Sequence, residues 1–201
     1  MITFRQFLLE DNLDIPKLCA KFITESKGLP LYRGSGKSIN EPTIITPRKD
    51  RSPLGTDREV HKAVDDWFKK NLDMNARTAG LFAIGDYPIA HSYGHVFFVL
   101  PIGDFKYVWG KSDGEYISDT YDITIKINRK KNAQQPGKYW QSVEEIANEI
   151  LSKVEWFTTN LSEAIEHNAE LSIICEKAIL VPTGDYDVEN LKTQYKKLIT
   201  A

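Results

Sequence analysis

The chain has 201 residues, of which 41% are hydrophobic and 27% charged, as in an ordinary soluble globular protein large enough to bury a core. Its formal net charge of −2 excludes a general electrostatic attraction to nucleic acid or membranes, although a local basic patch remains compatible with it. The longest apolar run, around residues 96–102, is too short to span a bilayer, and no signal-peptide pattern opens the chain. Cys19 and Cys175 lack metal-ligand spacing and are expected to be reduced, so we expect a single cytoplasmic domain over residues 1–201.

The first part of the chain is expected to be a helical segment over residues 1–28, followed by two short strands. Apolar residues at helical spacing predict one short helix over residues 1–11 and another over residues 15–28, where a glycine ends it. Two runs rich in apolar and β-branched residues, 30–34 and 43–48, predict the strands.

The next segment predicts a well-capped helix and then a β-rich centre. Residues 56–71 form an amphipathic pattern, and Thr56 with Glu59 has the spacing of a capping box. Runs of aromatic and β-branched residues then predict strands at residues 80–85, 95–102, 105–110 and 122–128.

The last third of the chain alternates a loop, helices and an apolar strand. Residues 129–138 are polar and contain proline and glycine, which predicts a surface loop. Ser142 and Glu145 form a second capping box for a helix through about Phe157, and a shorter helix is predicted over residues 161–167. The chain closes with a strand or hairpin and then a helix, at residues 170–182 and 187–199. Helices at both ends of a mostly antiparallel β core indicate an α+β fold.

Residues 31–38, with the sequence LYRGSGKS, are compatible with two functions. Lys37 could belong to a phosphate-binding P-loop, whereas Arg33 could project from a short strand. The P-loop requires a glycine where Leu31 stands and a helix beginning near Ser38, but two prolines and several β-branched residues follow. The sequence therefore favours the arginine strand.

Three features in order carry groups suited to chemistry. They are the Tyr32–Gly34 strand with its arginine, a strand–turn–helix–strand unit over residues 76–101, and Glu170 before a late apolar strand. Taken singly, each has an ordinary structural explanation, because strand-end arginines are usually surface charges, a helix-end tyrosine usually packs, and a glutamate before a strand is usually solvated. Together, the three features resemble the signature of the ADP-ribosyltransferase fold family of the Arg–Ser–Glu type.

The resemblance rests on motifs that follow one another in the family's order. The family's aromatic-Arg-Gly strand is matched by Tyr32–Gly34, and its glutamate before an apolar strand, a turn and a second strand by Glu170. Its strand and turn followed by A..YG is matched by Phe82, Gly85, Asp86, Ala90, Tyr93 and Gly94. The chain is most similar to ADP-ribosyltransferase-like proteins of tailed phages, which also carry PR.DR.P and AR[ST] sequences, matched here at residues 47–53 and 76–78.

This resemblance implies an ADP-ribosyltransferase-like split antiparallel β core flanked by helices. It implies an NAD-dependent mono-ADP-ribosyltransferase, phage-encoded, that modifies a host protein or nucleic acid during host takeover. Such an enzyme would act in the bacterial host cytoplasm or be packaged in the virion. NAD is the implied donor and no metal is expected, because the four histidines show no zinc spacing and His61 is expected at the surface. A non-catalytic binding or virion-associated module with this fold and an NAD glycohydrolase are the alternatives.

The resemblance also assigns roles to individual residues. Glu170 is the implied catalytic carboxylate, which stabilises positive charge on the ribose as the bond to nicotinamide breaks. Arg33 is expected to grip the NAD diphosphate and to act in catalysis, because a guanidinium binds phosphate oxygens bidentately. Tyr93 is expected to stack on the nicotinamide, and Phe82 to form a wall of that pocket.

The other implied NAD contacts are Gly34, Arg48, Arg51, Arg77, Thr78, Gly85 and Asp86. The glycines are expected to let the backbone approach the ligand closely. Asp86 is expected either to lie at the site or to cap the short helix that follows it.

Two positions depart from the family pattern. The family's Ser-Thr-Ser turn is replaced by residues 83–85, Ala-Ile-Gly, so the hydroxyl that orients the arginine and glutamate is expected from Thr78 or Thr46. Enzymes that modify arginine carry Glu or Gln two residues before the catalytic glutamate, where this chain has Asn168. The resemblance therefore implies an acceptor other than arginine, with His167 and Asn168 as substrate contacts.

Overall fold

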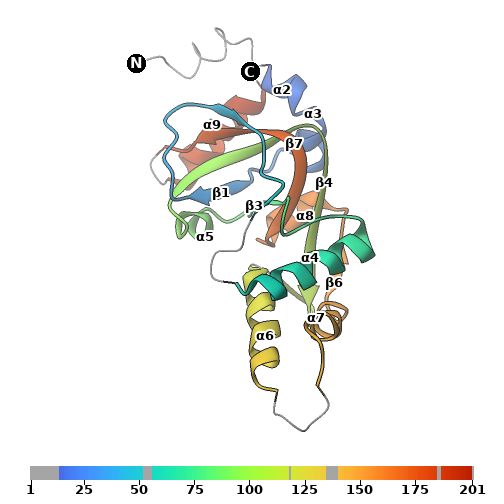
Figure 1. Ribbon diagram of the computed structural model, residues 1–201. Coiled ribbons are helices and arrows are strands. Elements are labelled where there is room, and N and C mark those ends of the chain that lie inside the picture. The colour runs from blue at the N-terminus through green and yellow to red at the C-terminus, as the bar shows by residue number, and fades with distance from the viewer. Residues whose placement is uncertain (1–13, 52–55, 118, 135–139, 185–186, 201) are drawn as a thin grey trace.

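The computed structural model describes residues 14–51, 56–117, 119–134, 140–184 and 187–200. These residues form an α+β fold in which a seven-stranded sheet with antiparallel pairing is flanked by helices (Figure 1). The helix predicted over residues 1–11 lies outside the described residues, as do residues 135–138 of the loop predicted over residues 129–138.

The described helices are α2 (Ile15–Leu18), α3 (Ala20–Glu25), α4 (Arg58–Leu72), α5 (Tyr87–His91), α6 (Tyr121–Asn132), α7 (Val143–Leu151), α8 (Leu161–Glu166) and α9 (Val188–Thr200). The strands are β1 (Tyr32–Ser35), β2 (Thr43–Ile45), β3 (Leu81–Ala83), β4 (His95–Ser112), β5 (Glu115–Tyr116), β6 (Glu155–Phe157) and β7 (Leu171–Pro182).

The two long strands β4 and β7 form the centre of the sheet. β4 contains both apolar runs that were predicted as separate strands, joined through a bulge between Ile102 and Phe105. β1 pairs with the beginning of β4, while β2 and β3 pair with opposite ends of β7. Reciprocal backbone hydrogen bonds of 2.8 Å between Tyr32 and Ile84 join β1 to the segment after β3. The beginnings of β1 and β7 and the end of β3 are thereby brought to one region.

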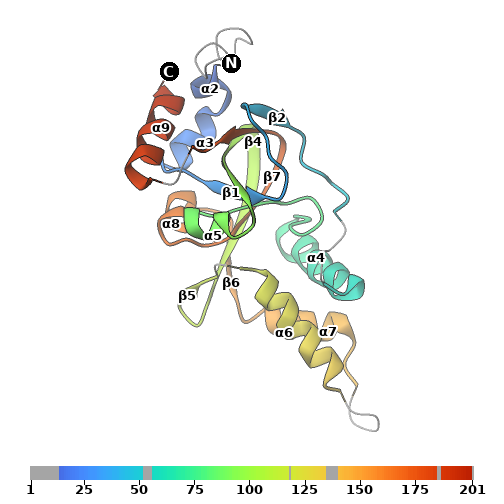
Figure 2. The same cartoon turned by 90° about the vertical axis from the view of Figure 1, so that its left-hand side faces the viewer.

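Two hydrophobic clusters support this sheet. The larger cluster contains the buried residues of β4 and β7 and is covered by α2, α3, α8 and α9. The smaller cluster joins α4, α6 and α7 to Val108 of β4. The helices α6 and α7 lie side by side and extend away from the sheet in both views (Figures 1 and 2). No described helix is long and apolar enough to cross a membrane.

The helix caps confirm one predicted capping box and correct the other. Ser142 and Glu145 form the reciprocal capping box at the start of α7. At α4 the cap is Asp57 rather than Thr56, because the Asp57 carboxylate accepts hydrogen bonds from the amides of Glu59 and Val60. A carboxylate also interacts favourably with the positive end of the helix dipole.

The strand predicted over residues 122–128 is wrong, because these residues lie in α6. Their alternation of isoleucine with polar residues suggested a strand, but Ile123 and Ile127 are also one helical turn apart. Both are buried in the cluster shared with α4 and α7, and this packing outweighs the β propensity of the branched side chains. The end of α6 extends into the predicted loop, through Asn132.

Two other helices differ from the prediction. The helix predicted over residues 15–28 is interrupted at Cys19, between α2 and α3. The helix predicted to reach Phe157 ends at Leu151, and residues 155–157 pair with β4 as β6. Residues 171–182 form one continuous strand, which is the first of the two alternatives considered for residues 170–182.

Candidate active site

One pocket of about 820 Å³ gathers most of the side chains singled out in the sequence. It lies among β1, the segment before β3, α5 and the start of α6, and its volume is typical of a ligand site. The predicted site residues that line it are Arg33, Gly34, Arg48, Arg51, Arg77, Phe82, Tyr93 and Glu170. They come from five separate segments of the chain.

Strand pairing brings the central groups together. Arg33 follows Tyr32 on β1, which is bridged to Ile84 just after β3. Ala83 of β3 pairs with Leu171, the residue that follows Glu170. The side chain of Arg33 links β1 to β3, because its Nη1 donates a hydrogen bond of 2.7 Å to the Phe82 carbonyl.

The arginines are held by backbone carbonyls and by one aromatic ring. Arg51 Nη1 donates to the Gly80 carbonyl at 2.7 Å, much as Arg33 does to that of Phe82. The guanidinium carbons of Arg51 and Arg77 lie 4.8 and 5.0 Å from the centre of the Phe82 ring, within cation–π distance. A guanidinium has five N–H donors, so each arginine keeps donors for a ligand. Phe82 thus organises the arginines as well as lining the pocket.

Crowding and burial act on these cations without neutralising them. The pKa of Arg33 is lowered to about 10, first by burial and then by the nearby Arg51, while Glu170 opposes both effects. Burial likewise lowers the pKa of Arg51 and Arg77. At neutral pH the Arg33 guanidinium therefore remains protonated.

Glu170 lies half-buried in the pocket and is oriented by a residue that the sequence did not reveal. The Thr120 hydroxyl donates a hydrogen bond of 2.5 Å to Glu170 Oε1 and accepts one of 2.8 Å from Arg77 Nη1. Burial raises the pKa of Glu170 to about 7, while the bond from Thr120 opposes this rise. The carboxyl group is therefore divided between its neutral and ionised forms near pH 7.

The hydroxyl was predicted from Thr78 or Thr46, and neither supplies it. The Thr78 hydroxyl instead donates to the Asp65 carboxylate, and Thr46 is exposed beyond β2. Thr120 stands in a polar stretch without a motif, just before the residues mispredicted as a strand. Thr120 is the residue before α6, and its hydroxyl reaches Glu170 from that position. This contact could not be expected while residues 122–128 were predicted as a strand.

Tyr93 lies at the mouth of the pocket. Its ring is 56% exposed, and its hydroxyl donates a hydrogen bond of 3.1 Å to Asp119 Oδ2. Burial and the neighbouring Asp119 raise the pKa of Tyr93 to about 12, so the hydroxyl keeps its proton. His61 of α4, predicted at the surface, is buried and lines the same pocket.

The two glycines have a different role from the one predicted. A Cβ on Gly34 would lie 1.9 Å from the Ala90 carbonyl oxygen, and one on Gly85 would lie 2.0 Å from that of Ile165. The close approach of α5 and α8 therefore requires glycine at both positions. Gly85 does not belong to the described pocket lining.

Three further predicted residues lie beside the pocket instead of lining it. Asp86 caps α5 by accepting a hydrogen bond of 2.8 Å from the Ile89 amide, the structural alternative of the two considered for it. Asn168 adopts a positive φ of 57° and lies 3.4 Å from Asp86 Oδ2 through Nδ2. His167 ends α8 and stacks on Tyr116, with ring centres 4.4 Å apart.

The turn after β1 excludes the P-loop alternative. Lys37 is exposed, and its amide donates to Ser35 Oγ at 3.1 Å. No helix begins at Ser38, because the chain continues without regular structure to β2. Lys37 and Arg33 nevertheless line the same pocket.

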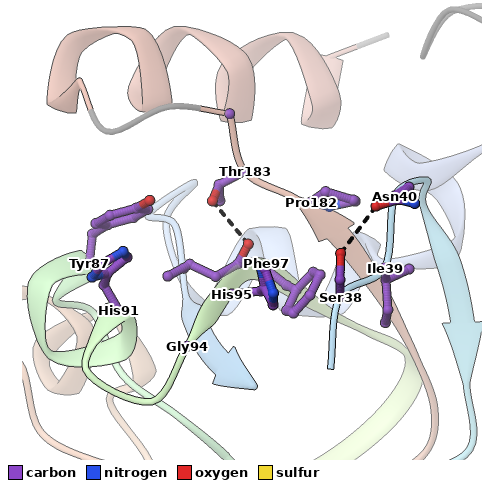
Figure 3. A pocket seen from close by; sticks show the side chains of 12 residues that line it. Ser38, Ile39, Asn40, Tyr87, His91, Gly94, His95, Phe97, Pro182 and Thr183 are labelled. Carbon is purple, nitrogen blue, oxygen red and sulfur yellow. Dashed lines mark hydrogen bonds between the residues drawn. The ribbon is translucent and has the colours of Figure 1, made fainter. Parts of the chain in front are cut away.

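A second pocket of about 720 Å³ lies on the other side of α5 (Figure 3). His91 and His95 line it, and Tyr87 stacks on His91 with ring centres 6.0 Å apart. Ser38 Oγ donates to Asn40 Oδ1 at 3.1 Å, and Thr183 Oγ1 donates to the Val96 carbonyl at 2.9 Å. None of the described residues that line this pocket is an arginine, lysine or carboxylate.

No protein-family model, curated protein or solved structure matches the chain. Within the described part of the chain, no group of three His, Cys, Asp or Glu side chains is placed to hold a metal ion. Its arginine-rich pocket can bind a diphosphate, and the Glu170 carboxylate can stabilise a positive charge that develops beside it.

Proposed function

We propose that the protein is an NAD-dependent mono-ADP-ribosyltransferase with an ADP-ribosyltransferase-like fold. The observation that carries the proposal is the position of Glu170 in one pocket with Arg33 and Phe82, each supplied by or beside a different strand. The family resemblance implies an arginine strand, a central strand and a strand preceded by the catalytic glutamate. The meeting of Arg33, Phe82 and Glu170 in one pocket supports that resemblance. We further propose a phage-encoded enzyme that acts on a host macromolecule in the bacterial cytoplasm.

The donor would be bound through its diphosphate. Arg33 and Arg51 are each anchored by one N–H on a backbone carbonyl and can present the remaining donors to phosphate oxygens. Because the anchors are already in place, little side-chain entropy is lost when the phosphate binds. The exposed Tyr93 ring at the pocket mouth can then stack on the nicotinamide.

The transfer would break the bond between ribose C1 and the nicotinamide nitrogen. The bonding electrons leave with nicotinamide, so positive charge develops on the sugar. An acceptor nucleophile then bonds to C1 and loses its proton to Glu170 or to water. A carboxylate about 4 Å from the developing charge, at an effective dielectric constant of about 20, contributes about 4 kcal/mol. That energy corresponds to roughly a thousandfold in rate.

The test is transfer of label from NAD that carries radioactive phosphate to a bacterial lysate. Wild type should label macromolecules, and Glu170→Gln should not. Glu176→Gln is the matched control, because Glu176 is an exposed carboxylate on β7, the strand that follows Glu170, and lies outside the pocket. Equal labelling by wild type and Glu170→Gln would overturn the assignment.

Two other outcomes identify the alternative functions. Release of free ADP-ribose without labelled macromolecules would indicate an NAD glycohydrolase, for which water is the acceptor. Absence of heat in calorimetry at millimolar NAD, together with no thermal shift, would indicate a non-catalytic binding module.

A further inference from the structure

The candidate pocket carries more positive charge than its donor requires. Its described lining contains five cationic side chains and two carboxylates, a net charge of +3 with both carboxylates ionised, although the whole chain is at −2. The cations are Arg33, Lys37, Arg48, Arg51 and Arg77, and the carboxylates are Asp119 and Glu170. The diphosphate of NAD neutralises only part of this charge. The remainder favours a second anionic ligand at the same place.

The cations of the lining differ in how exposed they are. Arg33, Arg51 and Arg77 are half-buried, whereas Lys37 is exposed and the Arg48 side chain is 69% exposed. Within the described part of the chain, Arg48 forms an ion pair of 3.3 Å with Asp50, whose side chain is 82% exposed, and such a surface pair is easily exchanged for another anion. We refer to Lys37, Arg48, Tyr93 and Tyr121 as the rim.

Two aromatic rings share this rim. Tyr93 is 56% exposed at the end of the α5 turn, and Tyr121 is 37% exposed at the first residue of α6. They are two of the four large hydrophobic side chains that are exposed in the described part of the chain, and both line the candidate pocket. Exposed aromatic rings between exposed cations are suited to unpaired bases and their phosphates, because bases stack on the rings and phosphates pair with the cations.

We propose that the acceptor is a single-stranded nucleic acid bound at the rim. Its bases stack on Tyr121 and on the face of Tyr93 that the nicotinamide does not occupy, and its phosphates contact Lys37 and Arg48. A duplex fits less well, because its bases are already stacked on each other and cannot reach the rings. A protein side chain would use neither the aromatic rings nor the surplus charge to the same extent. The transfer rests on the proposed function, whereas binding of the strand does not.

Binding is measured first, without NAD, by the fluorescence anisotropy of a labelled single-stranded oligonucleotide of mixed sequence, as DNA and as RNA. We expect binding that weakens with salt, with a slope in log affinity against log salt of about −0.7 for each phosphate contact. Replacing both rings, Tyr93→Ala with Tyr121→Ala, should weaken binding at least about tenfold. Trp140→Ala, which removes an exposed ring outside the pocket, should leave it unchanged.

Two variants separate stacking from other roles of the rim. Tyr93→Phe keeps the ring and loses the hydrogen bond to Asp119, so it should bind like wild type if stacking is the contribution. Lys37→Ala should reduce the salt slope by about 0.7, while Lys196→Ala, an exposed lysine on α9, should not change it. A double tyrosine variant or a Lys37→Ala protein that binds as well as wild type would overturn the proposal.

The second measurement follows label from NAD into the same oligonucleotide. Label that is removed by nuclease and resists protease supports the nucleic-acid acceptor, and label in the lysate that only protease removes overturns it. The two proposals fail in different ways. A strand that binds the rim while NAD is neither bound nor consumed contradicts the transferase assignment alone. NAD consumption without oligonucleotide binding at low salt contradicts the acceptor assignment alone.

Discussion

Two pockets of similar volume, about 820 and about 720 Å³, flank helix α5 and differ in almost every chemical respect. The arginine-rich pocket takes Ile89, Ala90 and Tyr93 from this part of the chain, and the histidine pocket takes Tyr87 and His91. Only the first contains arginines and carboxylates among its described lining residues. Volume therefore does not distinguish a candidate active site from a surface hollow, and the placement of ionic groups does.

The difference lies in how the polar groups are held. In the arginine-rich pocket, Arg33 and Arg51 are fixed by carbonyls of distant residues, and Thr120 links Arg77 to Glu170. In the histidine pocket, side-chain hydrogen bonds join Ser38 to Asn40 and Thr183 to the Val96 carbonyl. Charges that are fixed before the ligand arrives need no reorganisation during reaction, which is why such sites catalyse.

The largest effect is expected from Glu170→Gln. The amide has the shape of the carboxylate and can still accept the hydrogen bond from Thr120, but it cannot stabilise the positive ribose. We expect the rate of nicotinamide release from NAD to fall by roughly a thousandfold, with thermal unfolding near that of wild type. A fall of less than about tenfold would show that Glu170 is not the catalytic carboxylate.

The next largest effect is expected from Arg33→Ala. Loss of a charge-assisted contact to the diphosphate should weaken NAD use at least about thirtyfold, measured as kcat/KM for nicotinamide release. The kcat/KM of Arg33→Lys should lie between those of wild type and Arg33→Ala, because lysine keeps the positive charge and lacks the planar guanidinium. Circular dichroism must show a folded protein, since the Phe82 carbonyl also loses its partner. If the folded Arg33→Ala protein is as active as Lys196→Ala, the donor does not bind here.

The fold was largely predictable where local and tertiary preferences agree. The apolar faces of α4 and α7, the cap of α7 and the apolar runs of β4 and β7 are determined by neighbouring residues. The errors fall where tertiary contacts decide. Ile123 and Ile127 fit either a strand or a helix, and only packing against α7 selects the helix. Likewise, β6 exists because β4 offers it a pairing edge.

The candidate site was predictable in its charged residues and not in their connections. Arg33, Arg77 and Glu170 stand in short local motifs, so the sequence places them as candidates. Thr120 has no such motif, and its role appears only when the start of α6 meets Glu170. The packing role of Gly34 and Gly85 could not be predicted for the same reason. The carbonyls that approach them belong to helices distant in the sequence.

A smaller effect, with a pH signature, is expected from Thr120→Val. Turnover should require the ionised form of Glu170, whose pKa of about 7 makes the rate rise as pH increases through 7. The hydrogen bond from Thr120 lowers that pKa, so its loss should raise the pKa and move the midpoint to higher pH. At pH 7 we expect a loss of about fivefold, because a rise of roughly one unit from a pKa of about 7 lowers the ionised fraction from about a half to about a tenth.

Recovery at high pH distinguishes this effect from general damage. The rate of Thr120→Val should approach that of wild type well above the new midpoint, while Thr120→Ser should keep the original midpoint because it retains the hydroxyl. An unchanged midpoint in Thr120→Val, with the rate lowered equally at every pH, would show that Thr120 does not act through the ionisation of Glu170.

The smallest effect is expected on the other side of α5, from His95→Ala. His95 lines the histidine pocket and is exposed where β4 begins, so its removal disturbs neither the arginines nor Glu170. An exposed substitution of this kind changes a free energy by about 0.5 kcal/mol or less, which is about twofold. We therefore expect the affinity for NAD, measured by calorimetry, and the rate of nicotinamide release to stay within about twofold of wild type. If His95→Ala instead weakens NAD binding as much as Arg33→Ala, the donor occupies the histidine pocket. Fixed charge would then not distinguish the donor site from the other pocket.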